Sequence, residues 1–284
     1  MDYLIFGIVT GSILIIASIG FSMVWKTENF LNIAHGQILL IGAYSAYFFK
    51  VIMNLPFIVA VVASVISTAI LGLVFAKIFY FPVRKNGILV LLFTSVGLSW
   101  VIYGVIQGIV GPEIRTFGLE TSNMIELFGT QIISFLELSI IITSLVCIVS
   151  LHIILTKTKN GKGFRAMAEN RDLAQLRGIN SKKLSDYVWL ISSGLAGLAG
   201  ILLAMTGTLN MELGWHQILV IMSVVIVGGM GNLYGTMLAA LIIGLSMDLS
   251  TIFIPTSYRT AIAFIIVIVV LLIRPQGLSR GGAS

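Results

Sequence analysis

Charged residues are scarce in this sequence of 284 residues, and their scarcity decides its broad class. Only 10% of the residues are charged and 58% are apolar, with a mean hydropathy of +1.07. A soluble globular domain carries about 25% charged and about 45–50% apolar residues. A soluble core of this size cannot hold so many apolar side chains. The composition therefore excludes a soluble enzyme, a secreted disulfide scaffold and a disordered protein, and it predicts a membrane protein.

Cysteine, histidine and the common catalytic motifs are also rare or missing. The one cysteine, Cys147, lies in an apolar run, which excludes an intramolecular disulfide. The three histidines lie in separate segments, so we predict no metal site and no cofactor. The sequence has no His-Glu-x-x-His and no Gly-x-x-x-x-Gly-Lys-Ser/Thr motif. We therefore predict that the chain is not an enzyme, and that another chain hydrolyses any ATP on which it depends.

Long apolar runs, separated by short polar clusters, fill most of the chain. Backbone groups in lipid need internal partners and the runs are too long for barrel strands, so they predict helices. We expect an all-α membrane protein, a polytopic bundle of about 8–9 transmembrane helices in one domain of residues 1–284. The predicted spans are residues 4–24, 38–53, 57–81, 88–110, 132–155, 187–209, 215–249 (which the glycines of 228–232 divide into two short crossings) and 257–273.

The basic residues indicate how the chain is oriented. Of the 17 Lys and Arg residues, 14 lie in one set of loops, and Lys50, Arg115 and Arg259 lie in the other. Cytoplasmic loops carry the excess of Lys and Arg, so we predict an outside N-terminus and a cytoplasmic C-terminus. The net charge of +6 is spread over short loops at a membrane surface. We therefore expect contact with membrane lipid and none with nucleic acid.

Two segments interrupt the pattern of long spans, at residues 26–37 and from residue 210 to the glycines at 228–231. The apolar stretch 218–227 spans about 15 Å as a helix, too little for about 30 Å of hydrocarbon. Residues 37–41 (Gln-Ile-Leu-Leu-Ile) match residues 217–221 (Gln-Ile-Leu-Val-Ile), and a histidine precedes each copy. These features indicate broken helices and an inverted repeat, a pattern that marks transport sites, whereas chance similarity is the alternative.

The candidates for lining a translocation path are Asn32, His35, Gln37, His216, Gln217, Gly229 and Gly231. For the two histidines, the alternative is a structural role at each break.

The long basic loop of residues 156–186 contains a regular helical pattern. Residues 163–177 are mostly good helix formers, and Gly178 is a typical C-terminal stop. We expect one cytoplasmic helix with an apolar side formed by Phe164, Met167 or Ala168, and Leu173 to Leu176. Such a helix either docks a partner protein or lies on anionic lipid.

Four motifs in this chain resemble one known family. They are Asn32-Ile-Ala-His-Gly36, the loop pattern from Gly161 to Asn180, the cluster from Gly228 to Gly235, and the tail Arg274-Pro-Gln-Gly-Leu278. This arrangement resembles the LivH-type permeases of bacterial branched-chain amino acid ABC importers, although Lys26-Thr-Glu28 is more polar than the family's usual approach to the first motif. The resemblance implies two ATPase subunits, a second homologous permease, an extracytoplasmic solute-binding protein and a small-molecule substrate. It implies that the ATPase-coupling residues are Gly163, Arg165, Ala166, Ala168, Glu169, Asn170, Ala174 and Gly178.

Two other functions remain open at this point. The same machinery could carry urea, a short amide or another amino acid in place of a branched-chain amino acid. Alternatively, the chain could be an ion-coupled secondary carrier without an ATPase, because such carriers bury ionisable groups along their path. The candidates for such groups are Glu28, His35, Glu137, His152, His216 and Asp248. A non-transporting scaffold or lipid-binding protein is the third reading.

Overall fold

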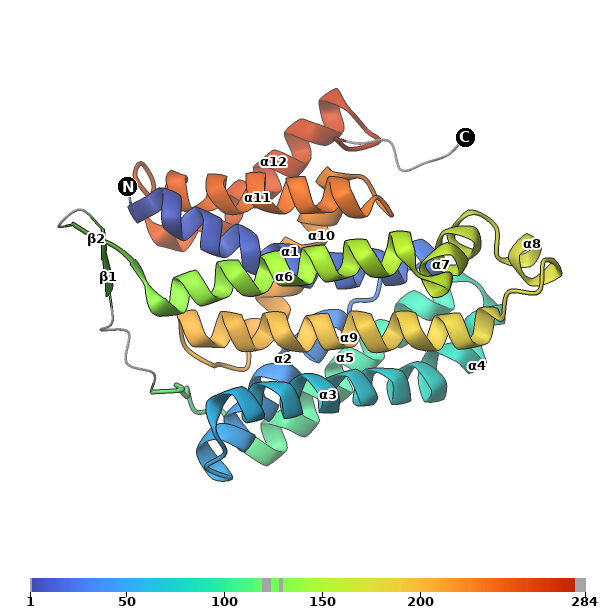
Figure 1. The fold of residues 1–284 in the computed structure, drawn as a ribbon, viewed down its shortest axis with the longest axis horizontal. Helices are drawn as coiled ribbons and strands as arrows, with labels where there is room; N and C mark the ends of the chain where they lie inside the picture. Colours follow the sequence, from blue (N-terminus) through green and yellow to red (C-terminus); the bar gives the residue numbers. More distant parts are fainter. Residues whose placement is uncertain (1, 119–123, 128–129, 279–284) are drawn as a thin grey trace.

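The computed structural model describes residues 2–118, 124–127 and 130–278, and most of them are helical. The longer helices lie side by side along the long axis of the molecule (Figure 1). The helices of this bundle are α1 (Asp2–Glu28), α2 (His35–Tyr47), α3 (Phe57–Phe75), α5 (Ile88–Val110), α6 (Phe135–Lys157), α9 (Ser181–Thr206), α10 (Leu213–Gly228), α11 (Leu233–Ser250) and α12 (Arg259–Ile273).

Short elements connect the bundle helices. They are the π-helical turns η1 (Phe48–Ile52) and η2 (Ala76–Tyr80), the short helix α4 (Phe81–Val83), the 3-10 turns η3 (Arg84–Asn86) and η4 (Thr256–Tyr258), the strands β1 (Met124–Leu127) and β2 (Thr130–Ser134), and the helices α7 (Lys159–Glu169) and α8 (Arg171–Leu176). The two strands form an antiparallel hairpin in which Met124 pairs with Ser134.

The helices confirm the predicted all-α polytopic bundle. Within the described ranges, seven helical stretches are long and apolar enough to cross a membrane. Two shorter helices join them, the apolar α10 with 16 residues and α2 with 13 residues before it continues into η1. The predicted interruption at residues 228–232 divides α10 from α11.

Several predicted span boundaries differ from the observed ones by a few residues, and two of these differences have a clear local cause. The span expected to start at residue 132 starts at Phe135, because the preceding residues form β2 and Ser134 caps the helix. The Oγ of Ser134 accepts a hydrogen bond from the Glu137 backbone N–H, and the Glu137 carboxylate accepts one from the Ser134 N–H. The span expected from residue 187 starts at Ser181, where the Asn180 side chain is the N-cap.

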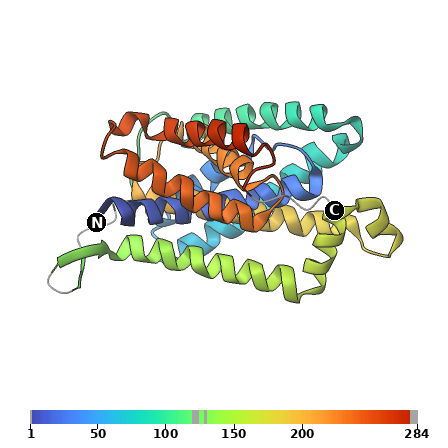
Figure 2. The ribbon, with the colours of Figure 1, turned by 90° about the horizontal axis from the view of Figure 1, so that it is seen from above.

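Helix α1 lies in the interior of the bundle and packs against α11, α9, α6 and α10, whereas α2 and α3 both pack on α9. Seen from above, α6 lies along one side of the bundle, and α5 and α12 lie along the other (Figure 2). Glycines allow several of these helices to approach closely. A Cβ on Gly42 of α2 would lie 2.3 Å from the Cα of Gly197 on α9, and one on Gly244 of α11 would lie 2.4 Å from the backbone N of Gly11 on α1. Small residues permit this close contact between membrane helices.

The ends of the bundle differ in composition. The C-terminal end of α1, the turn from α4 to η3, and helices α7 and α8 lie at one end, and the N-terminus lies at the opposite end (Figure 1). We call the first of these the basic end, because it carries Lys26, Arg84, Lys85 and the basic residues of the loop 156–186. The other we call the N-terminal end.

Candidate functional site

The two short helices, α2 and α10, meet at their first turns. A Cβ on Gly36 would lie 2.3 Å from the carbonyl oxygen of Gly214, and a Cβ on Gly214 would lie 2.8 Å from the carbonyl oxygen of Gly36. The two glycines therefore hold the backbones of α2 and α10 in direct contact. The positive ends of the two helix dipoles lie at this junction. The structure thus brings the two interrupted segments of the sequence together, although they are separated by more than half of the chain.

His35 and Gln37 flank Gly36 and are fully enclosed by protein. Nε2 of His35 lies 3.0 Å from the carbonyl oxygen of Ala17 on α1, and its ring meets Phe21 edge to face. The amide group of Gln37 is buried, and neither its Nε2 nor its Oε1 has a hydrogen-bond partner among the described residues. A Cβ on Gly214 would lie 3.0 Å from this Oε1. Gln37 therefore places a buried polar group at the junction of α2 and α10.

Asn32 lies just before α2 in a buried aromatic cluster. Its Oδ1 accepts a hydrogen bond of 2.9 Å from the hydroxyl of Tyr80, which stacks on Trp189 with ring centroids 4.8 Å apart. Phe30 packs against both of these rings. These contacts fix the irregular backbone that connects α1 to α2.

His216 and Gln217, in the first turn of α10, have surroundings different from those of His35. They line a cavity of about 880 Å³ between α1, α6, α9, α11 and α12. The cavity also contains Glu137 and an ion pair in which Nη2 of Arg259 lies 2.9 Å from Oδ1 of Asp248. The same Nη2 donates a hydrogen bond of 2.7 Å to Oγ1 of Thr10. This cavity combines apolar walls with groups of both charges.

Gly229 and Gly231 lie outside both of these features. They form the turn between α10 and α11, where their φ angles are 94° and 83°. These values lie in the left-handed region that glycine tolerates best. The Oδ1 of Asn232 then accepts a hydrogen bond from the Gly235 N–H and caps α11. Both glycines therefore have a clear role in turning the chain.

The loop 156–186 contains two helices, so the prediction of one continuous helix is wrong. The chain bends at Asn170, whose side chain accepts hydrogen bonds from the N–H groups of Asp172 and Leu173 and caps α8. Helix α8 ends at Leu176, and Gly178 follows with a φ of 80°.

This bend divides the predicted apolar side of the helix. Phe164 and Met167 of α7 are buried, as is Ala174 of α8, whereas Leu173 is 57% exposed and Leu176 is 84% exposed. The other predicted coupling residues lie on α7 or at its end. Gly163 is buried against Leu184, Ala166 and Ala168 are half-buried, and Arg165 and Glu169 are exposed. A guanidinium nitrogen of Arg165 donates to the carbonyl oxygen of Leu155 at the end of α6.

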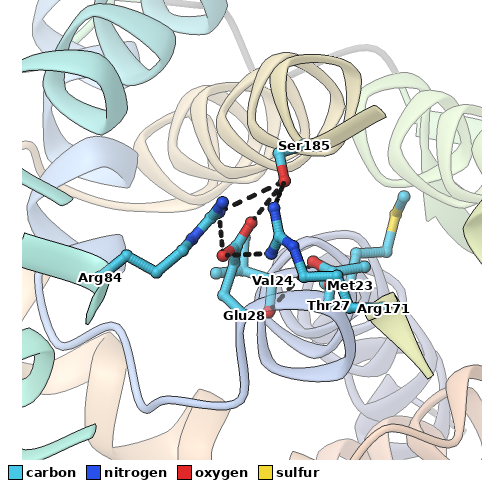
Figure 3. A network of polar contacts seen from close by, with 7 residues as sticks. All are labelled: Met23, Val24, Thr27, Glu28, Arg84, Arg171 and Ser185. Carbon is cyan, nitrogen blue, oxygen red and sulfur yellow. Dashed lines mark hydrogen bonds and ion pairs between the residues drawn. The ribbon is translucent and has the colours of Figure 1, made fainter. Parts of the chain in front are cut away.

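A buried ionic cluster connects α8 to the bundle. Glu28, the last residue of α1, pairs with Arg84 of η3 and Arg171 of α8, and it accepts a hydrogen bond from Ser185 of α9 (Figure 3). We call these four residues the Glu28 cluster. The sequence indicates Glu28 as a candidate buried acid, but it does not identify its partners. The sequence feature that indicates such partners is the position of Glu28 at the end of an apolar span, because a buried carboxylate there needs a cation nearby.

Both the sequence and the fold are similar to those of known proteins. Residues 3–271 match the family model described as branched-chain amino acid transport system / permease component. The high-affinity branched-chain amino acid transport system permease protein BraD of Pseudomonas aeruginosa is 26% identical over 98% of this chain and 95% of its own length. The high-affinity branched-chain amino acid transport system permease protein LivH of Salmonella typhimurium is 26% identical over 96% of this chain and 92% of its own length.

The fold also resembles a solved structure, PsaBC from Streptococcus pneumoniae in complex with Fab. The TM-score is 0.55 at 12% identity, and the match covers 97% of this chain and 91% of the other chain. At this identity the likeness concerns the fold alone.

Proposed function

Because the chain belongs to the family of branched-chain amino acid transport system permease components, we propose that it forms the solute path of an ATP-driven importer of branched-chain amino acids. The observation that carries this proposal is the family match over residues 3–271, which includes α2, α10 and the loop 156–186. The work is divided between chains: this one binds and releases the solute, and cytoplasmic ATPase subunits supply the energy. A second homologous permease and an extracytoplasmic solute-binding protein complete the assembly.

We propose that the path includes the junction of α2 and α10 and the cavity at the N-terminal end. The junction offers the buried Gln37 amide and the first turns of two helices. The cavity offers both signs of charge, through Asp248 and Arg259, beside apolar walls. An amino acid carries a carboxylate, an ammonium group and an apolar side chain, and this lining can complement all three.

The proposed test is ATP-driven uptake of leucine. The chain is purified in mild detergent with the proteins that co-purify with it, and the complex is placed in liposomes with the solute-binding protein outside and ATP inside. We expect leucine to accumulate only when ATP and the binding protein are both present. Accumulation driven by an ion gradient without ATP would favour the secondary carrier, and uptake of urea or acetamide in place of leucine would reassign the solute.

We also propose that the basic end is cytoplasmic, and labelling of single cysteines tests this orientation. Cys147 is first replaced with alanine, and a cysteine is then placed at the exposed residue Asn160 of α7 or at Phe253, which is 87% exposed after α11. In intact cells, a membrane-impermeant maleimide should label Phe253→Cys and leave Asn160→Cys unlabelled until the membrane is opened. The reverse pattern, or labelling of both from outside, would contradict the predicted topology.

A further inference from the structure

The Glu28 cluster joins four elements at the basic end through one buried carboxylate. The side chain of Glu28 is only 2% exposed, and its partners come from η3, α8 and α9 (Figure 3). A buried charge is retained at a substantial desolvation cost, so its partners must be well placed.

The cluster contains one negatively charged group, the Glu28 carboxylate, and two positively charged guanidinium groups. Oε2 of Glu28 accepts from Arg84 and also lies 3.4 Å from Nη1 of Arg171, while Oε1 accepts a hydrogen bond of 2.9 Å from the Ser185 hydroxyl. Both guanidinium groups donate to Oγ of Ser185, at 3.1 Å from Arg171 and 3.3 Å from Arg84. One carboxylate therefore holds two cations side by side. Without it, the two cations would repel each other and drive α8 away from η3.

The cluster connects a surface helix to the interior of the bundle. Helix α8 carries the exposed Leu173 and Leu176, and Arg171 is its first residue. Glu28 ends α1, which packs against α9, α10 and α11. Nearer the N-terminus of α1, the carbonyl oxygen of Ala17 contacts His35 at the start of α2. A displacement of α8 can therefore reach the junction of α2 and α10 through Glu28 and α1.

We propose that Glu28 is the positioning residue that transmits movement of α8 to α1, and that its contact with Arg171 couples ATP hydrolysis by a docked partner to opening of the path. This proposal rests on the proposed function, because it requires an ATPase that moves α8. Arg84 has a different role in the cluster: it anchors Glu28 to η3 whether or not α8 moves.

The experiment measures leucine uptake and ATP hydrolysis on the same proteoliposomes, with the full complex as it co-purifies. In Arg171→Gln, Glu28 keeps Arg84 and Ser185, so the membrane fold should be preserved while the ion pair with α8 is lost. We expect this complex to assemble and to hydrolyse ATP, but the leucine moved per ATP should fall about fivefold or more, the lower end of typical coupling between sites.

Three further variants distinguish a role in coupling ATP hydrolysis to transport from a purely structural link between α8 and the bundle. Arg171→Lys keeps the charge and should retain part of the ratio of leucine moved to ATP hydrolysed. The exchange of Glu28→Arg with Arg171→Glu keeps the net charge but sets the new guanidinium group at position 28 against Arg84, so it should not restore the ratio lost in Arg171→Gln. Lys77→Gln is the matched control. It removes a cation and the 3.2 Å ion pair with Asp186 at the same end without touching α8, and its ratio should match the wild type.

The outcomes separate this proposal from the proposed function. A wild-type ratio in Arg171→Gln would overturn the role of the Glu28 cluster and leave the importer intact. A lower ratio that follows loss of ATPase from the complex would also overturn it, since the cluster would then only support assembly. Absence of ATP-driven uptake by the wild-type complex would overturn the proposed function and this proposal with it.

Discussion

Replacement of Leu176 with aspartate is expected to remove most of the ATPase that we propose to bind the chain. Leu176 is 84% exposed on α8, which projects beyond the bundle at the basic end (Figure 1). Full burial of a leucine side chain contributes about 1.5–3 kcal/mol, and each 1.4 kcal/mol is tenfold in affinity. Aspartate would lose that contribution and bury a charge, so we expect affinity to fall by about tenfold or more. The ratio of ATPase to permease after purification in mild detergent measures this loss.

Membrane insertion should be unaffected, because Leu176 lies outside every membrane-spanning helix. Gln175→Asp is the matched control. It adds the same charge to the same helix at an exposed position but removes no apolar side chain, and it should have a much smaller effect.

Leu176→Trp distinguishes a protein partner from a lipid surface. A tryptophan would strengthen binding of α8 to a lipid interface and would disturb a fitted protein contact. Full retention of ATPase in both Leu176→Asp and Leu176→Trp would reject docking at α8.

Local patterns in the sequence predict much of the bundle. Helix α5 matches its predicted span, residues 88–110, because its apolar run is bounded by Gly87 and Gly111, whose φ angles of 102° and 80° disfavour continuation of a helix. The predicted break at 228–232 exists for the same reason. The split of α7 from α8 was also within reach of the sequence: Asn170 stands before Asp172, and asparagine is among the strongest N-cap residues.

Contacts between segments that are distant in the sequence could not be predicted from local sequence patterns. The motif copies at residues 37–41 and 217–221 mark two interrupted helices, but nothing local states that Gly36 touches Gly214. Likewise, a buried Glu28 predicts that a cation lies nearby, yet the sequence assigns 14 basic residues to the same set of loops. The choice of Arg84 and Arg171 depends on how α4, η3 and α8 fold back, which is a tertiary property.

Replacement of Gly36 with alanine is expected to abolish leucine uptake, because it separates α2 from α10. The new Cβ would lie 2.3 Å from the Gly214 carbonyl oxygen and 2.8 Å from the Cβ of Ile218, so the backbones must shift. Overpacking of a close contact typically costs about 1–3 kcal/mol. We therefore expect a lower thermal unfolding temperature as well as loss of uptake, both measured on detergent-purified or reconstituted protein at equal amounts.

The surroundings of each glycine predict how strongly its replacement with alanine reduces uptake. If any glycine-to-alanine change were equally harmful, this order would not appear. Gly214→Ala should be milder than Gly36→Ala, because its Cβ meets the Gly36 carbonyl at 2.8 Å and then the Gln37 side chain at 3.0 Å, which can turn aside. Gly104→Ala should be neutral or slightly stabilising, because a Cβ there meets no described atom within 4 Å and alanine is favoured over glycine in a helix by about 0.5–1 kcal/mol. Equal loss of uptake in all three variants would refute the junction as the cause. Full uptake with an unchanged unfolding temperature in Gly36→Ala would show that the contact of α2 with α10 does not limit transport.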